Sequence, residues 1–515
     1  MDREDDIRQW IDMHEEELVR DIGELVKIPS VSRPGQEQPD DVVEAAHSLM
    51  KIAAQYGFHT ENCDNRCVMI LYGDGESEVQ VWGHLDVVPA GEGWTYPPWD
   101  CTRKGDFLIG RGVSDNKGAV ITVLYCLRYM KEHNIKPCFR ISQICGLSEE
   151  TGMADAAYYL TKWPAPDFGF VSDCRFPLCY GEKGRCVVIL ERDSVPEGII
   201  DMSAGEASNS VPAEAVIRID RSIDMGDMEE EALRLGVMIR REVSGSIVSY
   251  TINGTPGHAA APDRCVNPIG LAGRLLKRGT GLKEEEKHIL EFLQKACLDG
   301  YGKELGIAAG DPVFEDLTCA GTVLEMKGRT VRLTMDIRYQ PSVNAGEMVE
   351  QLRKAAERYG FMVSAEEHRD GYCGSVDSEE VRALLAAYDH VVKDGKKPYV
   401  MGGNTYAGMI PNTVCFGPGI PKDYSELGLP AGHGGGHGCD EIQSVSSLKK
   451  AMEVYIHAFM NLNDLYKMRS GKRKKQSLKK MKGIENQNID GIMGLYSDAV
   501  SHGSSEYHLR ISYLS

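Results

Sequence analysis

Four short segments between residues 83 and 173 place carboxylates and an imidazole where chemistry could be done. Their chemically active members are His84, Asp86, Asp115, Glu149, Glu150 and Asp173. Residues two apart in a strand face the same side, so His84 could bind a metal while the Asp86 carboxylate holds its second ring N–H. Two-metal hydrolases need such a set: several carboxylates, a few imidazoles and one spare carboxylate as the base.

Each segment by itself also has an ordinary structural explanation. A His-x-Asp pair often lies on a surface, adjacent glutamates favour a helix start because of the helix dipole, and Asp173 could be a turn residue. A glycine-rich run at 432–438 with two histidines could be merely flexible, and no Gly-Lys-Ser/Thr closes it as in a phosphate loop. Four segments in order, each after a strand-like run, favour a ligand site at the carboxyl ends of strands.

The elements expected to position these residues alternate between strands and helices. Strand-like runs lie at 79–82, 139–145 and 168–171. Apolar residues recur at the spacing of one buried helical face at Val120, Val123, Leu124, Leu127 and Met130. Strand–helix–strand repetition of this kind predicts an α/β fold with a mostly parallel sheet.

A second pattern begins near 184 and predicts an inserted α+β domain. Residues 187–190 and 247–252 read as strands. Apolar and polar residues alternate between 331 and 338, as in a half-buried antiparallel strand. From 398 onward, glycine-rich loops and a predicted helix at 445–462 indicate a return to the first domain. The predicted organisation is a first domain at 1–183 and 396–466, an insert at 184–395 and a tail at 467–515.

The tail differs in charge from the rest of the chain. Residues 467–482 hold nine Lys or Arg and no Asp or Glu. A solvated, frayed tail is the ordinary explanation of such a run, and contact with an acidic partner is the alternative. No fold is predicted for 483–515.

Composition excludes several classes of function. At roughly 100–200 residues per domain, 515 residues predict two to three domains. With 58 Lys and Arg against 77 Asp and Glu, the net charge of -19 repels phosphate backbones, so the main body is not expected to bind nucleic acid. The acidic start has no apolar signal core, and the apolar run at 118–127 is far shorter than the ~20 residues of a membrane helix. Fifteen cysteines without a pairing pattern favour a reducing, cytoplasmic compartment.

Taken together, the motifs resemble a known family. The residues that carry the resemblance are, in order, His84-Leu85-Asp86-Val87-Val88-Pro89, Gly110-Arg111-Gly112, Asp115-Asn116-Lys117-Gly118 and Glu149-Glu150-Thr151-Gly152. Over about residues 10–465 the chain resembles the di-zinc metallopeptidase family of aminoacylase-1, carboxypeptidase G and succinyl-diaminopimelate desuccinylase. A Gly91-Glu92-Gly93-Trp94 insertion and the long middle domain look most like its peptidase V (Xaa-His dipeptidase) branch. The resemblance implies an α/β zinc-peptidase catalytic domain interrupted by a ferredoxin-like lid domain.

The resemblance also implies roles for individual residues. The residues that match the family's ligands are His84, Asp115 and Asp173 for one zinc ion, and Asp115, Glu150 and His437 for the other. Glu149 matches the general base, and Asp86 matches the carboxylate that orients His84. The family pattern further implies a cis peptide bond between Asp115 and Asn116.

His433 and His437 compete for the last ligand position. The family has a histidine four residues before a glutamate that leads into a helix, and His437 with Glu441 meets this pattern whereas His433 does not. The family more often has Ala-Asn than Cys439-Asp440 before that glutamate, and Cys439 is expected to be a packing residue.

The insert is implied to supply the residues around the substrate. His258 matches a lid histidine that stabilises the oxyanion, although it could be a surface turn histidine. Asn209 matches a lid asparagine that contacts substrate. Arg338 lies opposite its strand's apolar set and matches an arginine that clamps the substrate carboxylate, a bidentate task that lysine does less well. Thr405 lies in a glycine-rich loop that matches one near the bound substrate.

The expected activity is hydrolysis of dipeptides or very short peptides with a free C-terminal carboxylate, dependent on two zinc ions, with Mn²⁺ or Co²⁺ as substitutes. An N-acyl amino acid deacylase or desuccinylase with the same metal site is the first alternative. An inactive metal-binding scaffold is the second, and retention of Glu149 argues against it. The long insert, as in the peptidase V branch, predicts a monomer in which His258 acts on its own active site.

Overall fold

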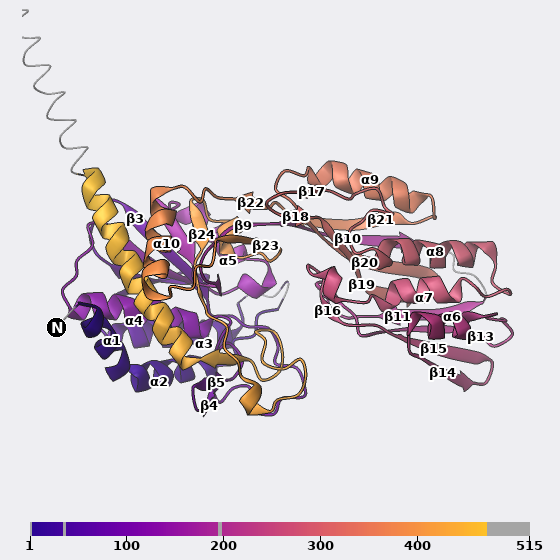
Figure 1. The fold of residues 1–515 in the computed structure, drawn as a ribbon, viewed down its shortest axis with the longest axis horizontal. Helices are drawn as coiled ribbons and strands as arrows, with labels where there is room; N and C mark the ends of the chain where they lie inside the picture. The colour runs from indigo at the N-terminus through magenta and orange to yellow at the C-terminus, as the bar shows by residue number, and fades with distance from the viewer. Residues whose placement is uncertain (1–2, 34, 36–37, 194–197, 471–515) are drawn as a thin grey trace, which may run out of the picture.

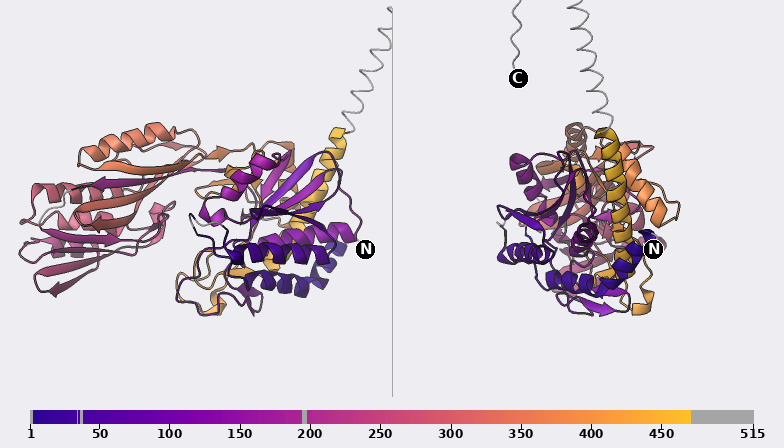
Figure 2. Two further views of the ribbon diagram at one scale, coloured as in Figure 1. Left: turned by 180° about the vertical axis from the view of Figure 1, so that it is seen from behind. Right: turned by 90° about the vertical axis from the view of Figure 1, so that its left-hand side faces the viewer.

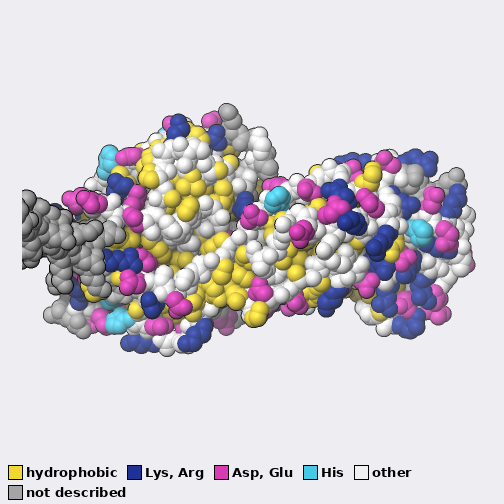
Figure 3. Space-filling view, turned by 90° about the horizontal axis from the view of Figure 1, so that it is seen from above, with side chains coloured by type: hydrophobic (Ala, Val, Ile, Leu, Met, Phe, Trp, Pro, Cys, Tyr) yellow, Lys and Arg dark blue, Asp and Glu magenta, His cyan; other side chains and the backbone are white. Residues whose placement is uncertain are grey.

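The computed structural model describes residues 3–33, 35, 38–193 and 198–470, which form an elongated molecule of two lobes (Figure 1). The main lobe contains a nine-stranded sheet and both ends of the described chain. The inserted lobe contains an eight-stranded sheet built from the middle of the chain. Figure 3 shows the two lobes from above, with acidic and basic side chains intermixed over the inserted lobe.

The sheet of the main lobe is parallel at its centre. Four strands run in the same direction and pair in the order β6 (Arg140–Gly146), β3 (Glu78–His84), β7 (Phe168–Val171) and β24 (Thr413–Cys415). The outer strands are β1 (His59–Cys63), β2 (Cys67–Tyr72), β9 (Cys179–Glu182), β22 (Tyr372–Cys373) and β23 (Tyr399–Met401). The predicted mostly parallel α/β sheet is therefore confirmed, with antiparallel pairs towards its edges.

Helices cover both faces of this sheet. The larger core contains α1 (Arg3–Met13), α2 (Glu15–Val26), α3 (Asp40–Gln55), α4 (Lys117–Glu132), α10 (Glu379–Val391) and a C-terminal helix that begins at Val445. The smaller core contains α5 (Ala154–Lys162) and the short turn η3 (Tyr406–Gly408). Alternation along β3 separates the cores, since Val81 belongs to the larger one and Trp82 to the smaller one. Helix α4 confirms the helix predicted from the spacing of its apolar residues, but residues 117–130 are all buried, so it is enclosed on every side and not along one face.

The inserted lobe is an antiparallel sheet with helices packed against one face. Its strands pair in the order β14 (Ile239–Ser244), β15 (Ile247–Asn253), β13 (Glu214–Asp220), β11 (Ile199–Ala204), β19 (Thr318–Lys327), β20 (Thr330–Tyr339), β10 (Gly184–Arg192) and β21 (Met362–Arg369). Its helices are α6 (Met228–Leu235), α7 (Pro268–Leu276), α8 (Glu284–Leu298) and α9 (Ala345–Glu357). The alternation predicted for 331–338 is confirmed, because Val331, Leu333, Met335 and Ile337 are all buried in this core.

The positions of two helices differ from those that the predicted domain limits imply. Helix α10 contributes Val381 and Leu384 to the core of the main lobe, although it falls within the predicted insert. The C-terminal helix continues to 470 and Arg469 pairs with Glu379 and Glu380 of α10, so 467–470 are helical rather than tail. The rest of the predicted tail lies outside the described residues. The domain limits stay a prediction, and α10 favours an end of the insert near 373.

Short strand pairs complete the fold. They are β4 (Thr102–Lys104), β5 (Phe107–Ile109) and β26 (Ile442–Ser444) in one sheet, and the pairs β8 (Cys174–Arg175) with β25 (Pro418–Gly419), β12 (Ser210–Val211) with β16 (Gly257–His258), and β17 (Gly310–Asp311) with β18 (Glu315–Asp316). Figure 2 shows the C-terminal helix running along the main lobe. Within the described ranges, no helix has the length and apolar character needed to cross a bilayer.

Candidate metal centre

Three of the four acidic segments meet at one edge of the main sheet. Because β3, β6 and β7 are parallel neighbours, their carboxyl ends lie together. His84 ends β3, the turn η1 (Glu149–Thr151) follows β6, and Asp173 comes two residues after β7. The register pairs His84 with Gly146, which brings the two glutamates close to the imidazole.

Asp115 reaches the same place by another route. The sequence predicted that Asp115, like the other three segments, follows a strand of the main sheet. It lies instead in the turn before α4. The peptide bond between Asp115 and Asn116 is cis, as the resemblance implied. The Asn116 amide donates to the carbonyl of Ser172 and to Asp173 Oδ1, both at 2.8 Å, which ties this turn to the end of β7.

Two groups of possible metal ligands share Asp115. The Nε2 atom of His84 lies 3.0 Å from Asp115 Oδ1 and 3.3 Å from Asp173 Oδ2. The Nε2 atom of His437 lies 3.2 Å from Asp115 Oδ2 and 3.2 Å from Glu150 Oε2. These are the two predicted ligand sets, and each set offers atoms close enough to hold one ion. His84, Glu149 and Glu150 form a third such group.

The donor chemistry of these residues fits divalent metal ions. The groups offer carboxylate oxygens and imidazole nitrogens, which Zn²⁺ and Mn²⁺ accept. Glu150 Oε1 is buried and has no hydrogen-bond partner among the described residues, as expected of an atom that faces a cation. The number and identity of the ions stay predictions.

The pKa values of the clustered carboxylates and histidines reflect the high density of negative charge at this site. Burial acts to raise the pKa of Asp115, but its hydrogen bonds with His437 and His84 outweigh burial and lower it. Hydrogen bonds to Asp115 and Glu150 raise the pKa of His437 to about 11. Burial raises the pKa of Glu149 well above its ordinary value, and the repulsion of Glu150 adds to this effect. These carboxylates therefore need positive charge nearby.

The role of Asp86 differs from the prediction. The Nδ1 atom of His84 lies 2.8 Å from the main-chain carbonyl oxygen of Asp86, and the carboxylate is farther away, at 3.6 Å. That carboxylate instead accepts from the backbone N–H groups of Glu149 and Glu150 at 3.1 Å and from the Ser32 hydroxyl at 2.7 Å. Asp86 thus orients His84 through its main chain and the two glutamates through its side chain. Burial raises the pKa of this carboxyl to about 6.

Sequence reasoning missed the supporting role of Glu441 and Arg111. The Glu441 carboxylate accepts from Arg111 and from the backbone N–H groups of Gly112, Ser114 and Asp115, at 2.8–2.9 Å. Arg111 also donates to the carbonyl oxygens of Gly436 and Gly438. This buried pair therefore joins the Asp115 turn to the loop that carries His437. The sequence signal was the arginine between two glycines and the glutamate four residues after His437.

His437, and not His433, faces the carboxylates. The Nδ1 atom of His433 lies 2.6 Å from Asp440 Oδ2, and Asp440 in turn accepts from the backbone N–H groups of Thr95 and Tyr96. His433 therefore holds the surrounding loop.

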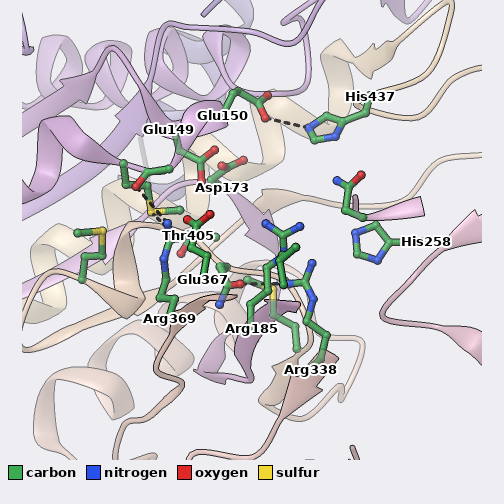
Figure 4. Close-up of a pocket in the computed structure, with 18 of the residues that line it drawn as sticks. Glu149, Glu150, Asp173, Arg185, His258, Arg338, Glu367, Arg369, Thr405 and His437 are labelled. Atoms are coloured by element: carbon green, nitrogen blue, oxygen red, sulfur yellow. Dashed lines mark hydrogen bonds and ion pairs between the residues drawn. The ribbon is translucent and has the colours of Figure 1, made fainter. Parts of the chain in front are cut away.

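The other predicted residues line the same cavity (Figure 4), Asn209, His258 and Arg338 from the inserted lobe and Thr405 from the main lobe. This cavity of about 550 Å³ is lined by Asn209, His258, Arg338 and Thr405 together with the acidic centre. The strand pair β12–β16 sets His258 beside Asn209, since the Ala259 N–H donates to the Asn209 carbonyl. A hydrogen bond positions the Thr405 side chain, because its hydroxyl donates to the buried Glu182 carboxylate at 2.6 Å. The predicted site residues all contribute to this region, and their roles in binding or catalysis stay predictions.

Comparisons with known proteins find relatives over most of the chain. Residues 81–461 match the family model described as Peptidase family M20/M25/M40. The chain is 27% identical over 466 residues to "Putative dipeptidase YtjP" of Bacillus subtilis (strain 168), a match covering 87% of this chain and 97% of that protein. It is 25% identical over 473 residues to "Putative dipeptidase SAR1836" of Staphylococcus aureus (strain MRSA252), covering 88% and 99%.

Solved structures share the fold at lower identity. Human carnosine dipeptidase 1 aligns with a TM-score of 0.57 and 17% identity, over 90% of this chain and 99% of that chain. The di-peptidase Dug1p from Saccharomyces cerevisiae aligns with a TM-score of 0.54 and 15% identity, over 89% and 98%. Both matches extend over the two lobes, so they support the fold with its lid.

Loss of the Glu441 carboxylate should destabilise the main lobe. In Glu441→Gln the buried Arg111 loses its charge partner, and we expect the free energy of unfolding to fall by about 3–5 kcal/mol. Urea unfolding of both proteins in chelator measures the change without a metal contribution. The matched control is Glu242→Gln, which breaks an exposed pair with Arg240 and should cost at most about 1 kcal/mol. Equal losses in the two variants would contradict the role of Glu441.

Proposed function

The chain belongs to peptidase family M20/M25/M40, and from that membership we propose that it hydrolyses dipeptides or very short peptides with two bound divalent ions. The observation that carries the proposal is the Asp115 carboxylate, whose two oxygens lie 3.0 Å from His84 Nε2 and 3.2 Å from His437 Nε2. Such a shared carboxylate can hold two cations side by side. The relatives from Bacillus subtilis and Staphylococcus aureus are named as putative dipeptidases, which supports a dipeptide substrate.

The ligand sets follow from the two groups around Asp115. His84 and Asp173 would complete the site of one ion, and Glu150 and His437 the site of the other. Bound there, two divalent cations would polarise a substrate carbonyl and make water more acidic. Zinc suits these donors best, and Mn²⁺ or Co²⁺ could replace it.

Glu149 is the proposed proton carrier. It lies next to Glu150 in η1, lines the cavity, and belongs to neither of the two sets that share Asp115. Asp86 fixes its position by accepting from its backbone N–H at 3.1 Å. We propose that Glu149 accepts a proton from the attacking water and passes it to the leaving amine.

Residues of the inserted lobe are proposed to orient the substrate. His258 would donate a hydrogen bond to the oxygen that becomes negative, with Asn209 beside it. Arg338 would bind the C-terminal carboxylate, and Asp336 holds its guanidinium in place at 2.6 Å. Since Arg338 and Glu149 line the cavity from different lobes, their separation sets the length of substrate that fits. His258 lines the same cavity as Glu149 of its own chain, which supports action within a monomer.

Metal content should depend on His437 and not on His433. Purified protein loaded with Zn²⁺ should retain two ions per chain after gel filtration, His437→Ala about one, and His433→Ala two. Elemental analysis of the three proteins measures this, and a chelator should abolish hydrolysis. Protein that holds no metal, with hydrolysis unaffected by chelator, would contradict the proposal.

Replacing Glu149 should separate catalysis from metal binding. Glu149→Gln keeps the size of the side chain and removes the base, so turnover should fall by about 100- to 10,000-fold. The control is the metal content of the same preparation, which should match that of the unaltered protein. Near-normal turnover would mean that Glu149 is a structural acid at the start of η1.

A panel of related substrates tests the substrate class and the role of Arg338. One dipeptide, its C-terminal amide, its N-acetyl form and a pentapeptide containing it are compared by kcat/KM. We expect the free dipeptide to be cleaved fastest, because a hydrogen bond from Arg338 to a charged carboxylate is stronger than one to a neutral amide. An amide cleaved as fast as the acid would rule out the role of Arg338. An N-acetyl form cleaved fastest would replace the dipeptidase by the deacylase alternative.

A further inference from the structure

Three arginines form a row across neighbouring strands of the inserted lobe. Arg185 on β10 pairs in register with Arg338 on β20 and with Arg369 on β21. Residues directly opposite each other in antiparallel strands extend from the same face of the sheet. All three arginines line the cavity of the acidic centre. Figure 4 shows them on the side of this cavity that faces Glu149 and Asp173.

One buried carboxylate serves two of these arginines. Asp336 is fully buried and accepts from Arg338 Nε at 2.6 Å and Arg338 NH2 at 3.2 Å. Its Oδ2 atom also accepts from Arg185 Nε at 2.8 Å. Arg338 alone therefore satisfies both oxygens of Asp336, so Arg185 is not required to neutralise this carboxylate.

The three arginines share the cavity wall with two carboxylates, those of Asp336 and Glu367, so one positive charge is left over on this face. Arg369 donates to the Met153 sulfur at 3.3 Å and to the Gly152 carbonyl at 3.1 Å, and it forms no ion pair within the described part of the chain. Burial lowers the pKa of Arg338, and the charges of Arg185 and Arg369 lower it further. Like charges placed directly opposite each other destabilise a sheet. An anion bound in the cavity would relieve this repulsion.

We propose that Arg185 binds a second carboxylate of the substrate, so that the preferred substrates are dipeptides ending in aspartate or glutamate. This inference rests on the proposed function, in which Arg338 binds the α-carboxylate. Neighbouring strands lie about 4.7–4.9 Å apart, so the guanidiniums of Arg185 and Arg338 lie side by side. Arg338 already donates to Asp336, Gly402 and Asn404, so Arg185 has the more available donors of the two. The two carboxylates of a C-terminal acidic residue are joined by a short aliphatic chain and match such a pair of donors.

The exposure of Arg185 agrees with a ligand-binding role. Its side chain is 31% exposed, whereas that of Arg338 is 5% exposed. Arg185 NH2 donates to the Ser208 hydroxyl at 3.2 Å, while NH1 has no hydrogen-bond partner among the described residues. The cavity therefore leaves part of this guanidinium free to donate to a bound anion.

The test compares Ala-Glu with Ala-Gln, two dipeptides of nearly equal size that differ in one charge. The measured quantity is the ratio of their kcat/KM values. Both substrates need the metal centre and Arg338. A substitution that disturbs Asp336 or the fold therefore lowers both kcat/KM values alike and leaves their ratio unchanged. A charge-assisted hydrogen bond predicts a ratio of about 10 or more for the unaltered protein, falling as ionic strength rises.

Variants assign the preference to Arg185. Arg185→Gln should bring the ratio close to one, and Arg185→Lys should keep part of the preference because it retains the charge. The matched control is Arg218→Gln on β13, where the arginine pairs with Asp201 away from the cavity, and its ratio should not change.

The possible failures are distinguishable. A ratio at or below one in the unaltered protein would overturn the inference, and so would a preference for Ala-Glu that survives Arg185→Gln. In either case, hydrolysis of Ala-Gln would leave the dipeptidase proposal standing. Failure to hydrolyse Ala-Gln, Ala-Glu and Ala-Ala alike would overturn the proposed function and this inference with it.

Discussion

The carboxylate of Asp115, held between two imidazoles, is the contact around which the main lobe is organised. A carboxylate in contact with both His84 and His437 must be positioned closely, because small displacements would lose one of them. The amide of Asn116 donates to Asp173, and Glu441 accepts the Asp115 backbone N–H at 2.9 Å, so both neighbours of the carboxylate are fixed. The parallel strands β3, β6 and β7 then bring the other predicted ligands to one sheet edge.

Two buried acids support this centre from opposite sides. Asp86 receives the backbone N–H groups of Glu149 and Glu150, and Glu441 receives those of Ser114 and Asp115. Burial raises the pKa of the first to about 6 and of the second to about 7. Each carboxylate thus accepts hydrogen bonds from the main chain of a predicted ligand or its neighbour. Asp86 and Glu441 therefore position the predicted ligands and are not ligands themselves.

The two lobes present opposite charges to the cavity between them. The main lobe contributes a concentration of carboxylates, and the inserted lobe contributes a row of three guanidiniums with the Glu367 carboxylate beside them. Substrates with a carboxylate at one end are oriented by such a field before any close contact forms. The inserted sheet therefore does more than cover the site, since its strand register spaces the charged groups that face the metal centre.

The sequence alone determined the residues of the acidic centre and much of the fold, because those signals are local. Alternation along 331–338 and the helical spacing of 120–130 predict a strand and a helix, and β20 and α4 confirm these elements. The patterns do not report burial fully, since α4 is buried on every side and Asp336 and Arg338 of β20 are buried as well. The spacing argument failed for Asp86 because β3 ends at His84, so the chain no longer alternates there. Helix α10 could not be assigned, since an apolar helical face does not specify which core it meets.

Only the tertiary structure decided that three arginines of the inserted lobe lie in a row. Arg185, Arg338 and Arg369 are far apart in the chain, and no local pattern connects them. They become neighbours because β10 pairs with both β20 and β21 in one register. A shift of that register by one residue would turn a side chain to the other face of the sheet. Register between distant strands is fixed by the packing of the whole lobe, which is why the sequence determined the residues of the acidic centre but not the row of arginines opposite it.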